Sequence, residues 1–244
     1  MLKKWIALLL LCVSVGANAS EVELAVGGTA LRYQMPSGYV RVSEQSPPLF
    51  GYLEAALPPT NRLVEAFYTP ADIQTLTAGG GIAKDTYFMV QAIRSIEHQT
   101  VASADWRGLL SQASAGMGKL DVNAEVASDD AARNQRLSKA AGVPTQAEFG
   151  KVSTPQIYRQ TDDEVRFIMF VPLTINSGGK SLVISGTCTG AMVLVRNKPI
   201  LVYAYRTSST SADIEIARQE LATAVEALAA LNPSSEAVAT TDGH

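Results

Sequence analysis

The sequence has few of the residues that build metal centres and nucleophilic sites. Its 244 residues include two cysteines, Cys12 and Cys188, and two histidines, His98 and His244. Structural zinc sites need four closely spaced Cys and His ligands, and this chain has no such cluster. The sequence therefore predicts neither a zinc site nor a haem site, and no cofactor is expected.

Clusters of basic charge are also missing. The chain carries 20 Lys and Arg against 23 Asp and Glu, and the basic residues are scattered singly. Nucleic acids and anionic membrane surfaces attract clustered basic residues, so neither is an expected partner. Hydrophobic residues make up 47% of the chain, which is enough for one sizeable domain.

Long apolar runs are absent except at the N-terminus. Two lysines precede an apolar run over residues 5–15, and the sequence Ala-Asn-Ala stands directly before Ser20. A basic start, a short apolar core and an A-x-A exit are typical of a secretory signal peptide. The run is too short for a membrane span, which needs roughly 18 residues or more. We therefore predict a cleaved signal peptide over residues 1–19 and export to the periplasm or the extracellular space.

Cleavage before Ser20 also removes Cys12. Three leucines precede Cys12, whereas a small residue is expected before the acylated cysteine of a lipoprotein, so lipidation is not predicted. The mature chain keeps 18 basic and 23 acidic residues, a net charge of −5. Because Cys188 is then its one cysteine, an intramolecular disulfide is excluded.

Alternation of apolar and polar residues predicts strands in the first part of the mature chain. Residues 22–26 and 31–34 flank the glycines 27 and 28, a pattern that indicates a hairpin. Other β-rich runs predict strands at 40–42, 62–68 and 86–93, and a short helix is expected over 49–57.

Two helices are predicted in the middle of the chain. Apolar residues recur at three- and four-residue intervals from Trp106 to Met117, with Ser103 as the expected N-cap. Gly116 and Gly118 are the expected stop. The Ala-rich and polar stretch 123–141 predicts a second helix that lies on the surface.

The C-terminal part predicts a β-meander followed by a long amphipathic helix. Four β-rich runs are joined by short polar or Gly-containing turns, which indicates antiparallel neighbours; they cover residues 149–158, 165–175, 182–196 and 200–205. Gly186 and Gly190 interrupt the third run and predict a bulge or bend. Ser211 is the expected N-cap of the helix, which Asn232 and Pro233 end. The helix stripe comprises Ile214, Ala217, Leu221, Ala224, Val225, Leu228 and Leu231.

These elements predict an α+β fold in which helices flank an antiparallel β-sheet. One domain is expected over residues 20–232, with a disordered tail over 233–244. The turn Pro36-Ser37-Gly38-Tyr39, the segment 190–205 and the helix 214–232 are the features that suggest a family. With these features, the order of elements resembles the Mog/PsbP-like α/β/α sandwich, which includes exported bacterial proteins of the DcrB type. The resemblance implies a small accessory or binding module and supplies no catalytic residues.

Cys188 is the candidate nucleophile of the mature chain. A catalytic thiol usually needs a histidine that accepts its proton, and His98 and His244 are the available ones. The fold has to bring His98 to Cys188 for this to work. The other interpretation is a buried strand residue that behaves as a small hydrophobe.

Carboxylate and glycine clusters give further candidates. The run Asp162-Asp163-Glu164 offers oxygen ligands for Ca²⁺ but lacks EF-hand spacing, so a solvated hairpin turn is favoured. Asp129-Asp130 is interpreted in the same way, as a helix-start or surface pair. The glycines at 79–81, with Lys84 after them, offer a phosphate cradle but lack P-loop spacing. The stretch 178–181 (Gly-Gly-Lys-Ser) joins two strands and is interpreted as a turn.

Aromatic side chains complete the candidates. Tyr39, Tyr52, Tyr68 and Trp106 offer apolar faces for a ligand or a carbohydrate. Trp106 shares its helical stripe with leucines, so a core position is expected for it.

No residue is assigned to a catalytic, cofactor or metal site. The sequence predicts an exported, non-catalytic accessory or binding protein that supports an envelope complex or binds a small ligand. The alternative is an exported hydrolase or transferase that uses Cys188 or carboxylates without a recognisable motif. A secreted factor that acts on other cells is a third interpretation.

Overall fold

The structure is a computed structural model that describes residues 20–79, 81, 83–207 and 210–233. The predicted signal peptide over residues 1–19 lies outside the described residues. So do residues 234–244 of the predicted tail, including His244.

A β-hairpin opens the described chain. Strands β1 (Glu21–Val26) and β2 (Thr29–Gln34) pair antiparallel and form a separate two-stranded sheet. Gly27 and Gly28 connect them, with φ angles of 53° and 81° that favour glycine. The predicted hairpin is confirmed.

The main sheet has eight strands and is antiparallel throughout. Its order is β3-β4-β5-β10-β9-β8-β6, and β7 also pairs with β8. The strands are β3 (Val40–Arg41), β4 (Asn61–Tyr68), β5 (Tyr87–Ile93), β6 (Thr145–Phe149), β7 (Gln156–Gln160), β8 (Glu164–Ser177), β9 (Lys180–Val195) and β10 (Lys198–Thr207). The predicted α+β class, with a C-terminal series of strands and a final long helix, is confirmed.

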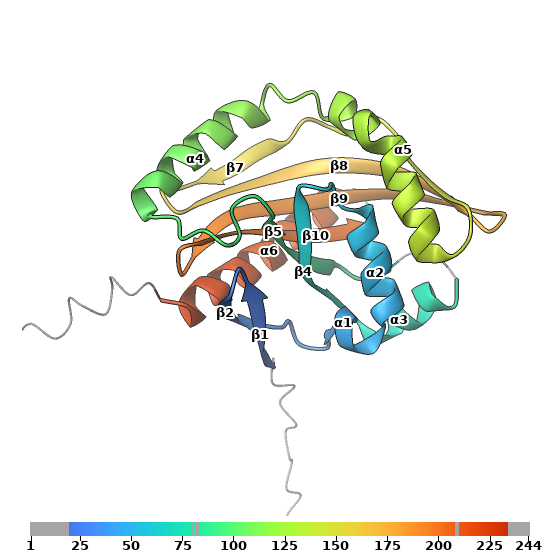
Figure 1. The fold of residues 1–244 in the computed structure, drawn as a ribbon, viewed down its shortest axis with the longest axis horizontal. Coiled ribbons are helices and arrows are strands. Elements are labelled where there is room, and N and C mark those ends of the chain that lie inside the picture. Colours follow the sequence, from blue (N-terminus) through green and yellow to red (C-terminus); the bar gives the residue numbers. More distant parts are fainter. Residues whose placement is uncertain (1–19, 80, 82, 208–209, 234–244) are drawn as a thin grey trace, which may run out of the picture.

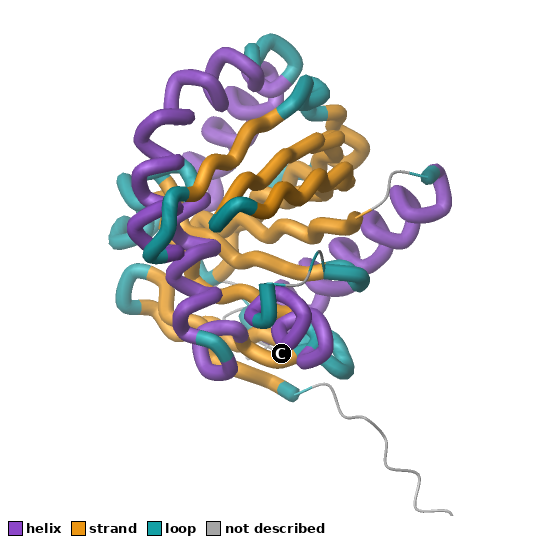
Figure 2. Tube along the Cα trace, turned by 90° about the vertical axis from the view of Figure 1, so that its right-hand side faces the viewer, coloured by secondary structure: helices purple, strands orange, loops and turns teal. Residues whose placement is uncertain are grey.

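Helices cover both faces of this sheet (Figures 1 and 2). The helix α6 (Ser211–Leu231) and the β1–β2 hairpin pack on one face, which we call the outer face. The helices of the other, inner face are α1 (Val42–Gln45), α2 (Pro47–Ala56), α3 (Pro70–Thr77), α4 (Ser103–Met117) and α5 (Val122–Ala141). The molecule is thus built in three layers.

Side-chain alternation along the strands assigns residues to the two faces. In β10, Ile200 and Val202 join the buried cluster beneath α6, whereas Tyr203 packs on the inner cluster with α2 and α3. On α6, five residues of the predicted stripe are buried: Ala217, Leu221, Ala224, Val225 and Leu228. The stripe therefore packs on the sheet as predicted.

The glycines of β9 mark close packing and not a bulge. Of the predicted bulge or bend, a bulge is absent: β9 pairs with β8 without a register shift through Gly186 and Gly190, and with β10 without a shift as far as Gly186. A Cβ on Gly190 would lie 2.5 Å from the ring of Phe167 and 2.9 Å from that of Tyr203. Glycine is needed there because two aromatic rings fill the space above the strand.

Several predicted boundaries are wrong. Residues 149–158 are not one strand: β6 and β7 pair in turn with the long strand β8, and the segment from Gly150 to Pro155 separates them. Residue 42 begins α1 and does not continue a strand, and α3 was not predicted.

Both helix caps predicted from serines are also wrong. The N-cap of α4 is Ala102, whose carbonyl accepts from Trp106 N, so the helix begins one residue earlier than expected. The N-cap of α6 is Thr210, whose hydroxyl accepts from Asp213 N at 3.2 Å. Within the described residues, no helix is long and apolar enough to cross a membrane.

Candidate functional site

Cys188 lies in the middle of β9, with β8 and β10 on either side. It is 1% exposed, and its register partners are Met169 of β8 and Tyr205 of β10. Burial raises the pKa of the Cys188 thiol to about 12, and a hydrogen bond with Tyr205 only partly opposes this. At neutral pH the thiol is protonated and out of reach of solvent, a poor arrangement for a nucleophile.

The fold does not bring His98 to Cys188. Lys198, the first residue of β10, donates through Nζ to the carbonyls of Glu97 and Gln99, on either side of His98. Cys188 faces Tyr205, seven residues further along β10. At about 3.3 Å per residue, roughly 23 Å of strand separates the two places. The His98 side chain is 77% exposed and 3.2 Å from Glu97.

The acidic run 162–164 does not form a cation site. Asp162 lies in the turn between β7 and β8 and extends toward Arg107 at 3.7 Å. Glu164, in contrast, is buried and accepts from Arg166 Nε at 2.9 Å, so it is already neutralised. Among the residues that the structure describes, no three His, Cys, Asp or Glu side chains are grouped so that they could hold a metal ion.

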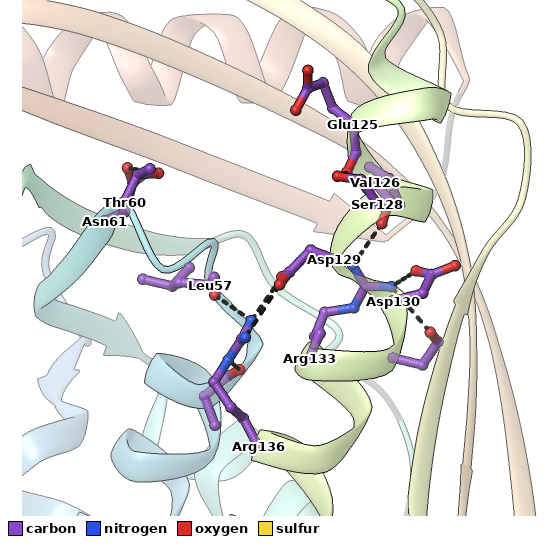
Figure 3. Close-up of polar contacts among 12 residues, drawn as sticks. Leu57, Thr60, Asn61, Glu125, Val126, Ser128, Asp129, Asp130, Arg133 and Arg136 are labelled. Atoms are coloured by element: carbon purple, nitrogen blue, oxygen red, sulfur yellow. Dashed lines mark hydrogen bonds and ion pairs between the residues drawn. The ribbon is translucent and has the colours of Figure 1, made fainter.

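Asp129 and Asp130 lie in the middle of α5, so of the two predicted alternatives the helix start is wrong; as a surface pair, both side chains are partly exposed. Asp129 pairs with Arg136 at 2.7 Å, and Asp130 pairs with Arg133 (Figure 3). Arg136 also donates to the carbonyl of Leu57, just after α2, at 3.0 Å. The two carboxylates therefore orient arginines and are not free ligands.

Arg133 contacts strand β6 from α5. Its guanidinium is buried and lies 4.5 Å above the ring of Phe149 in β6. Beside it, Leu137 is the one large apolar residue of α5 that is buried, so polar contacts hold much of this helix.

In the described part of the α3–β5 loop, two backbone N–H groups that follow the glycines are already occupied. In the α3–β5 loop, the N–H groups of Lys84 and Asp85 donate to the buried carboxylate of Asp72, at 2.8 and 3.3 Å. A phosphate would need such donors free. Gly178 and Gly179 form the two-residue turn between β8 and β9, both with positive φ, as predicted. Gly80 lies outside the described residues.

The predicted aromatic residues are mostly structural. Trp106 is 1% exposed and its indole N–H donates to the carbonyl of Asp163 at 2.9 Å, which confirms a core position. The hydroxyl of Tyr39 donates to the carbonyl of Thr86 at 2.5 Å. Tyr68 is buried and stacks on Tyr87 with ring centroids 4.5 Å apart. Tyr52 is half-buried on α2 and remains as a surface candidate.

An open hollow at the tip of the β8–β9 hairpin is the feature that sequence reasoning missed. It has a volume of about 790 Å³ and lies between the C-terminal half of α5 and the hairpin tip. Its lining is rich in amides and hydroxyls and has one charged residue, Lys180; the other residues are Asn134, Gln135, Ser138, Pro144, Thr145, Gln146, Asn176, Ser177, Gly178, Gly179 and Ser181. We call it the tip hollow.

Side-chain hydrogen bonds hold the walls of the tip hollow together. Ser138 of α5 accepts from Thr145 N at 2.9 Å, and Asn134 accepts from Ala147 N at 2.8 Å. The hydroxyls of Thr145 and Ser177 lie 2.7 Å apart and join β6 to β8. Of the lining residues, the sequence singled out only the stretch 178–181, which was interpreted as a turn; the hollow itself was not predicted, because segments distant in the chain build it together.

Comparisons with known proteins give a limited likeness. No protein-family model and no curated protein matches this sequence. One similar solved structure is the Ran-binding protein Mog1p of Saccharomyces cerevisiae, with 10% identity over 87% of this chain and 94% of that one and a TM-score of 0.35. Another is cyanobacterial PsbP (CyanoP) of Synechocystis, with 14% identity over 88% and 95% and a TM-score of 0.34. This is a weak Mog/PsbP-like resemblance, and scores this low support no argument about function.

Proposed function

We propose that this protein is an exported, non-catalytic accessory protein that binds a partner in the cell envelope. The observation that carries the proposal is the tip hollow. Its amide and hydroxyl groups suit the backbone of a partner segment, and Lys180 is its one charged residue. Neither Cys188 nor His98 lines it, so the hollow contains neither the candidate thiol nor its candidate base.

Export is part of the same proposal. It is supported by the basic start, short apolar core and A-x-A exit of residues 1–19. The first strand begins at Glu21, and Met35 N donates to the carbonyl of Ser20 at 3.0 Å. A chain that begins at Ser20 therefore keeps every residue of the β1–β2 hairpin.

A small neutral ligand is the second candidate for the tip hollow. Hydroxyl and amide side chains also match the hydrogen-bonding groups of an uncharged polar molecule. The hydrolase or transferase alternative has less support, because burial keeps the Cys188 thiol protonated and away from solvent.

Native mass spectrometry tests the proposal directly. The protein is expressed with its own N-terminus and purified gently from the exported fraction. We expect a mature chain that begins at Ser20 and carries a stoichiometric partner, whereas a small adduct would favour the second candidate. A bare chain, or a chain that keeps residues 1–19, contradicts the proposal.

A matched pair of variants locates the binding site. Gln135→Arg places a bulky charge in the tip hollow, and we expect it to remove the bound species. Gln112→Arg makes the same change on an exposed position of α4 and should leave binding intact. Equal loss in both variants, or in neither, would show that the hollow is not the site.

A further inference from the structure

Part of one edge of β9 has none of the described strands beside it. Strand β10 pairs with β9 as far as Gly186, and β10 ends opposite this residue, at Thr207. Residues 180–185, which we call the free edge, remain paired with β8 on their other side. Among the described strands, none pairs with the free edge. Unpaired edges are usually short, charged or covered, because they can pair with another chain.

The turn geometry determines which backbone groups the free edge offers. Gly178 and Gly179 form a two-residue turn, so Ser177 and Lys180 are the pair that closes it. In an antiparallel ladder, consecutive residues direct their N–H and C=O groups to opposite sides. Ser181, Val183 and Ser185 therefore direct theirs away from β8, to the open side.

The side chains of the free edge are apolar at its centre. Val183 is 68% exposed on the outer face of the sheet, more than any other large hydrophobic residue in the described part of the chain. Leu182 and Ile184 are half-buried on the inner face, and none of the three belongs to a buried core cluster. Figure 1 shows this end of the hairpin reaching beyond the other strands. Exposed apolar residues beside an unpaired edge indicate an interaction surface.

The sequence of the free edge matches itself when it is reversed. Residues 181–185 are Ser-Leu-Val-Ile-Ser, which has the same order of residue classes in both directions about Val183. When two copies pair antiparallel about Val183, it meets the partner's Val183, and Leu182 meets the partner's Ile184. Ser181 meets the partner's Ser185. Lys180 falls opposite the partner's Gly186, so no two lysines meet.

Backbone and side chains therefore agree on one register. In this register Ser181, Val183 and Ser185 face residues of the partner as hydrogen-bonded pairs. They are also the three residues whose N–H and C=O groups point to the open side. A two-fold axis perpendicular to the sheet keeps Val183 and its counterpart on the outer face, and this is the self-complementary contact of a symmetric dimer.

We propose that two copies of this chain pair through the free edge and form one continuous sheet. A strand from a different protein would find the same backbone groups, but the symmetry about Val183 favours an identical strand. The α3–β5 loop lies beside the beginning of the edge, where Lys180 Nζ donates to the carbonyl of Gly79 at 3.4 Å. The side chains of Ser181, Val183 and Ser185 remain exposed. The inference goes beyond the proposed function, because this assembly needs no envelope partner.

Cysteine crosslinking tests the register. Facing residues in an antiparallel pair have Cα atoms about 5.5 Å apart, within the range that a disulfide bridges. Under mild oxidation, Val183→Cys should form a covalent dimer. Ser181→Cys and Ser185→Cys should each stay uncrosslinked alone and crosslink when mixed, because each residue lies roughly 13 Å from its own counterpart in this register. Crosslinking of Ser181→Cys alone, as fast as that of Val183→Cys, would overturn the proposal.

The oligomeric state gives an independent measurement. By sedimentation equilibrium the mature chain should be a dimer, and Val183→Lys should weaken its self-association by about tenfold or more, since like charges then face each other. Ile216→Lys changes another exposed apolar residue, on α6, and should leave the dimer unchanged. A wild-type monomer, or a dimer that Val183→Lys does not affect, contradicts the inference. Native mass spectrometry separates this dimer from a complex with an envelope protein by mass.

Discussion

Cys188 shows how one residue's environment decides between two chemistries. The sequence left open a nucleophile and a small core residue, because both are compatible with a β-strand. In the structure Cys188 lies in β9, between β8 and β10, and burial raises the pKa of its thiol to about 12. The residue type alone could not reveal this, since exposure depends on β8 and β10 and not on the neighbours of Cys188 in the sequence.

We expect Cys188 to be inert in the folded protein. A mature chain starting at Ser20 should incorporate no thiol-directed reagent at about pH 8, because a buried and protonated thiol is a poor nucleophile. In denaturant the chain should incorporate one equivalent, because the exposed thiol then has a pKa near 8.5. The reagent count by mass spectrometry checks this. Rapid labelling without denaturant would revive the enzyme alternative.

Gly190 is where the core has no room for a side chain. We expect Gly190→Ala to destabilise the protein by about 1–3 kcal/mol, because the new Cβ would meet the rings of Phe167 and Tyr203. Gly108→Ala is the control: it lies within α4, and a Cβ added there would have no neighbouring atom within 4 Å. This second change should stabilise by roughly 0.5–1 kcal/mol through helix propensity. Urea unfolding measures both, and a neutral Gly190→Ala would contradict the packing argument.

At the scale of elements, β4 shows a feature that periodicity could not predict. Glu65 in this strand is completely buried, and it accepts from Arg41 Nε at 2.8 Å and from Ser43 N at 3.1 Å. A register shift between Leu63 and Glu65 turns the carboxylate toward these partners. Residues 62–68 were still correctly predicted as a strand, because their β-rich composition outweighs one charged residue.

Helix α5 depends on polar contacts more than the other long helices do. Arg136 donates to the carbonyls of Ala55 and Leu57, at 3.1 and 3.0 Å, and pairs with Asp129 (Figure 3). These bonds occupy carbonyls at the C-terminal end of α2, which its own helix leaves without partners. The surface position of α5 was predicted, but this junction with α2 was not.

We expect Arg136→Ala to loosen α5 before the rest of the fold. It should lower the free energy of unfolding by about 1–3 kcal/mol, because two carbonyls lose a charged donor. Hydrogen exchange should show the lost protection mainly over residues 122–141. Lys139→Ala is the matched control, since it removes a positive charge from an exposed position of the same helix. Uniform loss of protection across the sheet would show that α5 is not a separate unit.

At the scale of the whole molecule, a row of tyrosines crosses the inner face of the sheet. Tyr68, Tyr87 and Tyr205 stack in succession, with centroids 4.5 and 5.0 Å apart, and Tyr203 continues the row. Burial is the main cause that raises the pKa of each of these tyrosines. The folded protein therefore holds these protons more tightly than the unfolded chain does.

This difference predicts a loss of stability in alkali. The unfolded chain releases the thiol proton near pH 8.5 and the tyrosine protons near pH 10, while the folded state keeps them. Stability should be intact below about pH 8 and fall above it, by up to roughly 1.4 kcal/mol per pH unit for each group. Urea unfolding at about pH 7.5, 9 and 10.5 measures this. In Cys188→Ala the decline should begin only near the tyrosine range, and an unchanged stability up to about pH 10.5 would contradict the prediction.

The element types and much of their order could be predicted from the sequence. Period-two and period-3.6 patterns depend on residues close in the chain, so the hairpin, the late strands and the stripe of α6 were predictable. The division of 145–160 into two strands was not, since it requires the long partner β8. The burial of Cys188, its separation from His98, the tip hollow and the free edge of β9 became visible only in the folded chain. Each of these depends on which distant segments lie side by side, and no local pattern of residues encodes that.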